Sequence, residues 1–507
     1  MDSFNCKRIT LLLLLFLFKA AFVFPQPTRA DKPSGTDSRF SFTAPENEGF
    51  SSKGLCNIFS YVKENKVNIH SLLIIRHKRV IFDAYFYPFR PNLRHDIASC
   101  TKSITALLTG IAIDKGYIKN EDQLVSGFFP EIKPPSKGFE TLTIKDLLTM
   151  TSGFDCSFAN EDSLFYRLFQ SSNWPGFIFN IPFAAEPGKQ FSYCSCNYYL
   201  LAEIIYRATK LSPEDFAKKY LFNPLGIKSV YWSKNDKGIN YGWGDLALKP
   251  YDLAKISQLL LDDGKWNGKT VISLNWLKKS EAMNTKFDNG NGYGYGFWLD
   301  RDHAYNAEGR GGQRLLIDPV NKTIIVVTAG GYNWDDKGGM GDIIGSAHHF
   351  DKKLKNDPLA YKSLRKLENE AARLVNDSSG HVYVSTEKNK LFNKALLFPK
   401  NSLSIKSAEI VEQNGKTFFK LIPISGPTIS YPLGIGAAYK FYKDPGSGHL
   451  FALGGYWKAD SEFEIEFNML SKINKYLVDF KIDNHIRVMI KEGTHEINEE
   501  FPVMIEN

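Results

Sequence analysis

One serine–lysine pair, followed by an apolar helical stretch, constrains this chain more than any other feature. The motif Ser99-x-x-Lys102 leads into small and apolar side chains, and four large ones recur there at helical spacing: Ile104, Leu107, Leu108 and Ile111. Residues three apart lie on one face of a helix, so the Lys102 amine would lie beside the Ser99 hydroxyl. The apolar stripe would bury the helix and hold the pair rigidly.

The motif alone is weak, because Ser-x-x-Lys occurs four times in the chain. The other matches are Ser60/Lys63, Ser363/Lys366 and Ser385/Lys388. Each of them lies in a polar or charged stretch that is typical of a solvated helix or a turn, and none has an apolar run to hold it. The context therefore favours Ser99 as the nucleophile.

Three later motifs follow the Ser99 helix. Residues 143–153 read TIKDLLTMTSG, a helix followed by a turn. Residues 193–195, Tyr-Cys-Ser, lie within PGKQFSYCSCNYYLLAEII, and residues 308–313, EGRGGQ, precede the strand-like segments RLLIDP and TIIVVTAGG. With residues 71–116, these motifs resemble the serine β-lactamase and penicillin-binding-protein superfamily, closest to its class C and esterase-like branch. The resemblance covers residues 41–350.

This resemblance implies an α+β fold for residues 41–350: an antiparallel sheet flanked by helices, with a helical subdomain inserted between residues 100 and 250. The pattern then changes. Residues 351–380 place apolar side chains on one helical face and predict a linking helix. Residues 381–507 show short alternating strands between Gly, Asn, Asp and Pro turns, so we predict a C-terminal all-β domain, a sheet or a barrel.

A serine hydroxyl is a poor nucleophile at neutral pH and needs a base within hydrogen-bond distance. The resemblance implies that Lys102 or Tyr193 supplies it, and the sequence leaves open which of the two acts. Tyr193 would also pass a proton to the leaving group or help to activate the water that releases the acyl group. The catalytic candidates are therefore Ser99, Lys102 and Tyr193.

Four consecutive residues would bind the substrate: Arg310, Gly311, Gly312 and Gln313. By the same resemblance, the backbone N–H groups of Ser99 and Gln313 would form the oxyanion hole, and the two glycines would let the substrate approach the strand. The planar guanidinium of Arg310 suits a carboxylate. A structural ion pair of Arg310 with Glu308 or Asp302 is the alternative.

Ser195 is a further candidate for substrate binding. It departs from the pattern, because the tyrosine motif of this superfamily ends in Asn. An amide both donates and accepts hydrogen bonds to a substrate amide, whereas a hydroxyl is shorter. We therefore expect weak or absent cephalosporin turnover. The prediction is an exported serine hydrolase acting through an acyl-enzyme on small esters, amides or D-amino-acid peptides, including oligoamide dimers of the kind some relatives cleave. A penicillin-preferring β-lactamase and a non-turnover binding or sensor protein for β-lactams or envelope ligands are the alternatives.

The first residues of the chain predict export. Lys7 and Arg8 precede an apolar run that breaks at Lys19, and Thr28-Arg29-Ala30 would serve as the cleavage site. The run is short for a membrane span. We therefore favour a signal peptide over residues 1–30 and a periplasmic or secreted location, with an uncleaved membrane anchor as the alternative.

The charge of the chain and its motifs limit which classes of molecule it is expected to bind. Removal of residues 1–30 takes away four basic residues and one acidic residue and lowers the formal net charge from +8 to +5. The remaining lysines are interspersed with acids, so nucleic-acid binding has no support, while a weak attraction to the cell envelope remains compatible with the charge. No Gly-x-Ser-x-Gly elbow or His-Glu-x-x-His motif occurs. We expect a monomer with a small-molecule or short-peptide substrate, no cofactor and no metal.

Five cysteines follow residue 30: Cys56, Cys100, Cys156, Cys194 and Cys196. If the protein is exported, it is in an oxidising compartment, where a disulfide such as Cys156 to Cys196 can form. Five small buried side chains are an equally good interpretation.

Overall fold

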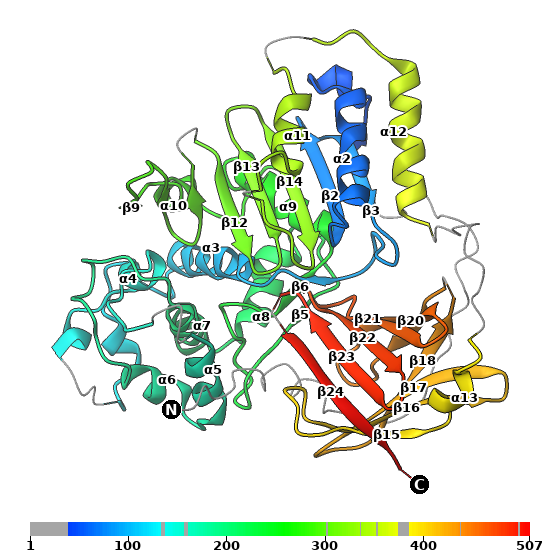
Figure 1. Ribbon diagram of the computed structural model, residues 1–507. Coiled ribbons are helices and arrows are strands. Elements are labelled where there is room, and N and C mark those ends of the chain that lie inside the picture. Colours follow the sequence, from blue (N-terminus) through cyan, green and yellow to red (C-terminus); the bar gives the residue numbers. More distant parts are fainter. Residues whose placement is uncertain are drawn as a thin grey trace.

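Figure 1 shows the computed structural model of the protein. The structure describes residues 39–132, 137–156, 161–300, 303–334, 336–350, 353–373, 385–436, 438–494 and 497–506. The predicted signal peptide, residues 1–30, lies outside these ranges, as do residues 374–384, where the predicted linking helix ends and the predicted β domain begins. In the part of the chain that is described, no helix has both the length and the apolar character needed to cross a bilayer.

A nine-stranded sheet forms the centre of the N-terminal half (Figure 1). Its order is β1-β3-β2-β14-β13-β12-β11-β10-β9, and every pair is antiparallel except the parallel β1–β3 pair. The strands are β1 (Ser41–Phe42), β2 (Ile69–Arg76), β3 (Arg79–Tyr85), β9 (Thr285–Lys286), β10 (Gly292–Tyr293), β11 (Trp298–Leu299), β12 (Tyr305–Gly309), β13 (Gln313–Asp318) and β14 (Thr323–Ala329).

Helices cover both faces of this sheet. One face carries α2 (Ser52–Glu64), α11 (Met340–Ala347) and α12 (Pro358–Ala371), and the other carries α3 (Cys100–Asp114), α9 (Pro250–Leu261) and α10 (Leu274–Ser280). Side chains alternate between faces along a strand. Leu72 and Ile74 of β2 accordingly pack with α2, α11 and α12, whereas Leu73 and Ile75 pack with α3 and α9. A strand buried on both faces must be apolar at every position, as β2 nearly is.

A helical subdomain lies on the side of α3 that faces away from the sheet (Figure 1). Its helices are α4 (Ile144–Leu148), α5 (Glu161–Gln170), α6 (Trp174–Phe179), α7 (Ser195–Thr209) and α8 (Pro213–Ala217). Shorter helical turns are η2 (Pro45–Glu48), η3 (Val125–Phe128), η4 (Lys137–Glu140) and η6 (Lys218–Phe222). Small strands complete this half: β4 (His95–Asp96), β5 (Tyr231–Trp232) and β6 (Leu246–Leu248) form one sheet, and β7 (Lys265–Trp266) and β8 (Lys269–Thr270) form another.

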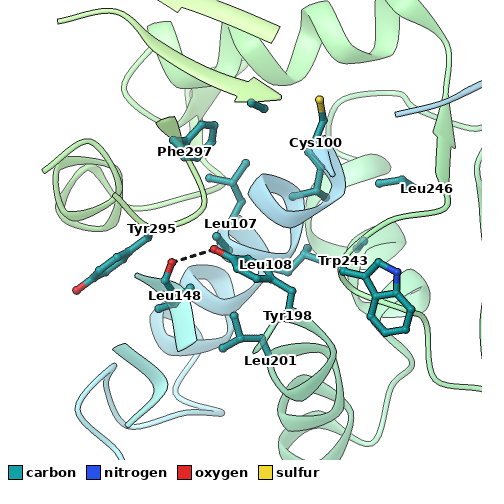
Figure 2. Packing of buried hydrophobic residues seen from close by; sticks show 14 of the residues in the cluster. Cys100, Leu107, Leu108, Leu148, Tyr198, Leu201, Trp243, Leu246, Tyr295 and Phe297 are labelled. Atoms are coloured by element: carbon teal, nitrogen blue, oxygen red, sulfur yellow. Dashed lines mark hydrogen bonds between the residues drawn. The ribbon is translucent and has the colours of Figure 1, made fainter. Parts of the chain in front are cut away.

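Helix α3 lies in the middle of the largest apolar core, as its sequence predicted. Ile104, Leu107, Leu108 and Ile111 are at most 1% exposed. Figure 2 shows Leu107 and Leu108 packed near Tyr198, whose hydroxyl donates a 2.9 Å hydrogen bond to the Leu148 carbonyl. The helix that begins next to Ser99 is thus anchored along its whole length.

The C-terminal part of the chain, from residue 385, is an all-β domain built on a ten-stranded sheet in the order β18-β17-β16-β15-β24-β23-β22-β21-β20-β19. A parallel pairing of β18 with β20 closes the sheet into a barrel, and apolar side chains fill its interior. The strands are β15 (Ala395–Leu397), β16 (Ile405–Gln413), β17 (Lys416–Pro423), β18 (Ile429–Ile435), β19 (Lys440–Lys443), β20 (Leu450–Ala459), β21 (Glu462–Asn468), β22 (Lys475–Ile482), β23 (Ile486–Glu492) and β24 (Ile497–Ile505), with α13 (Lys388–Leu391) beside them. The predicted α+β fold class with an all-β C-terminal domain is confirmed.

Candidate active site

Ser99 lies at the end of a tight turn, immediately before α3. Ala98 has a φ of 46°, in the left-handed region that non-glycine residues seldom occupy. The Asp96 carboxylate holds this turn by accepting a 2.8 Å hydrogen bond from the Ala98 N–H, and the Cys100 N–H donates to the Ile97 carbonyl over 3.1 Å. The turn therefore presents the serine from a fixed backbone.

Lys102 lies one helical turn beyond Ser99 and directly contacts it. Its Nζ donates to Ser99 Oγ over 2.9 Å and to the Trp243 carbonyl oxygen over 3.2 Å. The side chain is 2% exposed, and within the described ranges no carboxylate forms an ion pair with it. A nucleophile and a nitrogen base joined by one hydrogen bond are the arrangement needed for nucleophilic catalysis.

Tyr193 completes a group of three. The Lys102 Nζ lies 4.8 Å from the centroid of the Tyr193 ring. On its other side the tyrosine stacks on Trp298, with the ring centroids 5.9 Å apart and an angle of 15° between the planes. The structure therefore brings Ser99, Lys102 and Tyr193 together, although their catalytic roles stay predictions.

A disulfide anchors the segment that carries Tyr193. Cys194 is bonded to Cys156, which follows the Thr-Ser-Gly turn, with the two Cα atoms 5.3 Å apart. Pairing of Cys156 with Cys196 is therefore wrong. Cys194 has an extended backbone just before α7, whereas Cys196 has already entered the helix and is a buried cysteine outside the disulfide. The Cys194 N–H also donates to Met150 Sδ over 3.4 Å.

The three sulfur atoms of Cys156, Cys194 and Cys196 lie within 4.8 Å of one another. Thiolates at this spacing are potential ligands of a soft metal ion. Two of the three are joined in the disulfide, and a disulfide sulfur has no thiolate to offer. The cluster therefore acts as a covalent brace behind Tyr193 in this structure.

The turn between β12 and β13 lies against the Ser99 turn. A Cβ atom on Gly309 would fall 3.0 Å from the Ser99 nitrogen, and the Cys100 thiol donates to the Gln313 carbonyl over 3.7 Å. Gly311 and Gly312 have φ values of 82° and 90°, a conformation that favours glycine. The backbone of this turn is thus next to the nucleophile, where the oxyanion hole is predicted.

The side chain of Gln313 has a structural task. Its amide nitrogen donates to the Ala329 carbonyl, and its amide oxygen accepts from the Ala329 N–H over 3.1 Å. With 2% of its surface exposed, it fastens the turn to β14. Only the backbone N–H of Gln313 is therefore left for the oxyanion role that the sequence predicts.

Arg310 reaches toward the C-terminal domain, where its Nη1 donates to Thr494 Oγ1. Of the acids considered as its ion-pair partners, Glu308 forms a 3.1 Å ion pair with Arg314, and Asp302 lies outside the described residues. Ser195 is the first residue of α7 and is 5% exposed. The substrate-binding roles of Arg310 and Ser195 stay predictions.

Sequence reasoning missed a second set of residues around the nucleophile. The Trp243 carbonyl holds Lys102, and Lys472 of the C-terminal domain lies 3.3 Å from Asp96 and 3.1 Å from Asp245. Burial raises the pKa of Asp96 to about 6, even though the Lys472 ammonium opposes the shift. None of these positions carries a local motif, because each contact joins segments far apart in the chain.

One protein-family model matches the part of the chain that contains the residues of the site. The family model described as Beta-lactamase matches residues 60–344, which is more than half of the chain. The matched span contains Ser99, Lys102, Tyr193 and Gln313 and ends before the C-terminal barrel.

The chain is similar to several known proteins. The 6-aminohexanoate-dimer hydrolase of Paenarthrobacter ureafaciens is 24% identical over 292 residues, which is 52% of this chain and 73% of that enzyme. Protein flp of Staphylococcus aureus strain MW2 is 30% identical over 181 residues, which cover 33% of this chain and 36% of protein flp. The solved structure of the octameric penicillin-binding protein homologue from Pyrococcus abyssi is 19% identical to this chain. The alignment covers 90% of this chain and 99% of the homologue, with a TM-score of 0.45.

Proposed function

Since this chain belongs to the beta-lactamase family and is a serine hydrolase, we propose that it cleaves small esters or amides through an acyl-enzyme formed on Ser99. The observation that carries the proposal is the 2.9 Å hydrogen bond between Lys102 Nζ and Ser99 Oγ, in a buried setting. Lys102 Nζ lies within reach of the Ser99 hydroxyl and would take its proton while Ser99 Oγ attacks the substrate carbonyl carbon.

The tetrahedral intermediate would place its negative oxygen toward the backbone N–H groups of Ser99 and Gln313. Support for this placement comes from the contact between the Ser99 turn and the β12–β13 turn. Collapse of the intermediate would expel the alcohol or amine with the proton returned from Lys102 or Tyr193, and a water molecule would then release the acyl group. Donors aimed at the developing charge supply a large share of such catalysis.

The substrate class rests on two features. Ser195 stands where an Asn would hold the amide of a β-lactam, and a hydroxyl at this buried position makes fewer hydrogen bonds than a carboxamide. The relative named 6-aminohexanoate-dimer hydrolase acts, by its name, on a dimer of 6-aminohexanoate. We therefore propose linear esters, amides and short D-amino-acid peptides as substrates ahead of cephalosporins.

We also propose that the protein is exported under the direction of residues 1–30 and acts as a monomer. The Cys156–Cys194 disulfide supports export, because disulfides persist in oxidising compartments. Fractionation of expressing cells, with non-reducing peptide mapping and size-exclusion chromatography with light scattering of the exported form, tests both points. Protein confined to the cytoplasm with reduced cysteines would contradict the export proposal.

Intact-mass spectrometry tests the chemistry. Wild type and Ser99→Ala are incubated with a fluorophosphonate, a penicillin and p-nitrophenyl acetate, and ester turnover is followed in parallel. The expected result is one fluorophosphonate adduct on wild type, none on the variant, and ester cleavage faster than penicillin cleavage. Fast penicillin turnover without ester cleavage would favour a β-lactamase, and a stable penicillin adduct without turnover would favour a sensor.

A further inference from the structure

The C-terminal barrel contacts the segment that leads to Ser99 through the loop between β21 and β22. In this loop the Ser471 carbonyl accepts a 3.2 Å hydrogen bond from the Asp96 N–H, and Lys472 projects its Nζ between two carboxylates, 3.3 Å from Asp96 Oδ2 and 3.1 Å from Asp245 Oδ1. Lys472 itself is 7% exposed. A lysine is seldom buried to this degree unless it is paired.

Both carboxylates belong to segments that hold the catalytic pair. Asp96 uses its other oxygen to accept the Ala98 N–H, so it shapes the turn that presents Ser99. Asp245 lies two residues after Trp243, whose carbonyl oxygen accepts from Lys102 Nζ. Lys472 therefore closes a ring of contacts that runs from Ser99 through Asp96 and Asp245 to Lys102.

We propose that Lys472 is a positioning residue for the Ser99–Lys102 pair, so that the C-terminal barrel completes the active site. The inference rests on the function proposed above. By drawing Asp96 and Asp245 together, the ammonium fixes the distance between the Ser99 turn and the Trp243 carbonyl, and hence the orientation of Lys102 toward Ser99.

Two neighbouring contacts place more of the barrel at the same site. The side chain of Ile473 fills the space above Gly311, where an added Cβ would fall 2.4 Å from its Cγ2. Thr494 Oγ1 accepts from Arg310 Nη1 and, over 3.2 Å, from the Asn474 amide. Two positions of the predicted substrate-binding wall, Gly311 and Arg310, are thus in contact with the C-terminal domain.

The electrostatic surroundings of Lys472 come from several elements. The groups that face it are Asp96 and His95 of β4, Asp245, Tyr231 of β5, Tyr241, and His449 before β20. Burial opposes the charge of Lys472, but the two aspartates raise its pKa above the usual lysine range. Without this cation, two buried carboxylates would face each other and repel when both are ionised.

The test compares three variants by their rate constant for fluorophosphonate labelling of Ser99. Lys472→Met removes the charge, Lys472→Arg keeps it, and Lys458→Met is the matched control. Lys458 also bridges acids in the barrel, 3.1 Å from Glu464 and 2.6 Å from Asp479, but these partners lie within the barrel itself. Circular dichroism and light scattering establish that each variant is folded.

We expect Lys472→Met to slow labelling by about 10²-fold, as misplacement of a catalytic group by about 1 Å does. Lys472→Arg should regain most of the rate, because a guanidinium also bridges two carboxylates, and Lys458→Met should match wild type. The deficit of Lys472→Met should grow as the pH rises and the two unpaired aspartates become ionised.

Wild-type labelling by folded Lys472→Met, or equal slowing by Lys458→Met, would overturn the inference while leaving the proposed function intact. A wild-type protein that is not labelled at Ser99 would overturn the proposed function and the inference with it. If Lys472→Met does not fold, Asp245→Asn breaks the same bridge with a side chain of equal size, and a wild-type rate in that variant would overturn the inference.

Discussion

The imidazole rings of His70 and His95 share a 2.7 Å hydrogen bond between Nδ1 of His70 and Nε2 of His95. His95 Nδ1 lies 2.7 Å from the Asp96 carbonyl oxygen and must donate to it, so His95 Nε2 accepts the proton of His70. Both rings are buried next to the segment that leads to Ser99. These hydrogen bonds therefore require a neutral His95 ring, and burial lowers the pKa of His70 well below its usual range.

This pair predicts a specific loss of stability in acid. Burial lowers the pKa of His95 from 6.5 to about 4. Between these two pH values the unfolded chain binds a proton at His95 and the folded protein does not. The contribution of neutral His95 to the free energy of unfolding is fully present above pH 6.5. It is lost as the pH drops toward 4, by about 3 kcal/mol in total at about 1.4 kcal/mol per pH unit. Urea unfolding at several pH values should show a shallower acid loss in His95→Gln than in wild type. His77→Gln, at a half-exposed ring, is the control, and equal slopes in all three proteins would contradict the prediction.

Lys102→Met should reduce ester turnover by about 10²–10⁴-fold with little change in folding, because the variant keeps the apolar stem but loses the base. The chain offers a matched control in Lys63→Met, the lysine of a second Ser-x-x-Lys match, which is exposed at the end of α2. Steady-state kinetics of both variants, with circular dichroism, checks this prediction. Wild-type kcat in Lys102→Met would remove Lys102 from the mechanism.

Tyr193→Phe separates packing from proton transfer. The phenyl ring can keep the stack on Trp298, so stability should stay near that of wild type. If the hydroxyl serves the release of the acyl group, kcat should fall by about 10²-fold or more and a covalent adduct should accumulate on Ser99. Stopped-flow bursts with p-nitrophenyl acetate measure this, with Tyr206→Phe of α7 as the control. An unchanged kcat would leave Tyr193 a packing residue.

Cys156→Ser should lower the free energy of unfolding by about 2–4 kcal/mol, since the disulfide closes a loop with a sequence separation of 38 residues. Activity should fall as well, because Cys194 adjoins Tyr193. Urea unfolding compares the variant with Cys56→Ser, which removes a cysteine that is free in the structure. Peptide mapping that finds Cys156 linked to Cys196 would contradict the observed pairing.

Gly110→Ala should destabilise the protein, although the same change stabilises most exposed helices. The added Cβ would fall 2.2 Å from two atoms of the Trp276 indole, so the cost should be about 1–3 kcal/mol. Gly345→Ala is the control, because α11 leaves nothing within 4 Å of its added Cβ, and a gain of about 0.4–1 kcal/mol is expected there. Thermal and urea unfolding of both variants measure the sign, and a stable Gly110→Ala would show that the indole moves aside.

The sequence foresaw contacts whose geometry is local. The three-residue spacing of Ser99 and Lys102 places both on one helical face in any α-helix. The apolar stripe that follows predicts that the helix is buried. The alternating patterns in residues 381–507 predicted an all-β domain for the same reason, because alternation with a period of two follows from the extended chain.

Only the tertiary structure decided which distant segments meet. Cys156 had two neighbouring cysteines to choose from, and the choice of Cys194 depended on where the chain enters α7. Lys472 lies in a barrel loop with no motif, and its contact with Asp96 and Asp245 exists only because the barrel packs against the Ser99 turn. Helical spacing is dictated by the backbone alone, whereas a contact across hundreds of residues depends on the docking of complete surfaces, which no local pattern encodes.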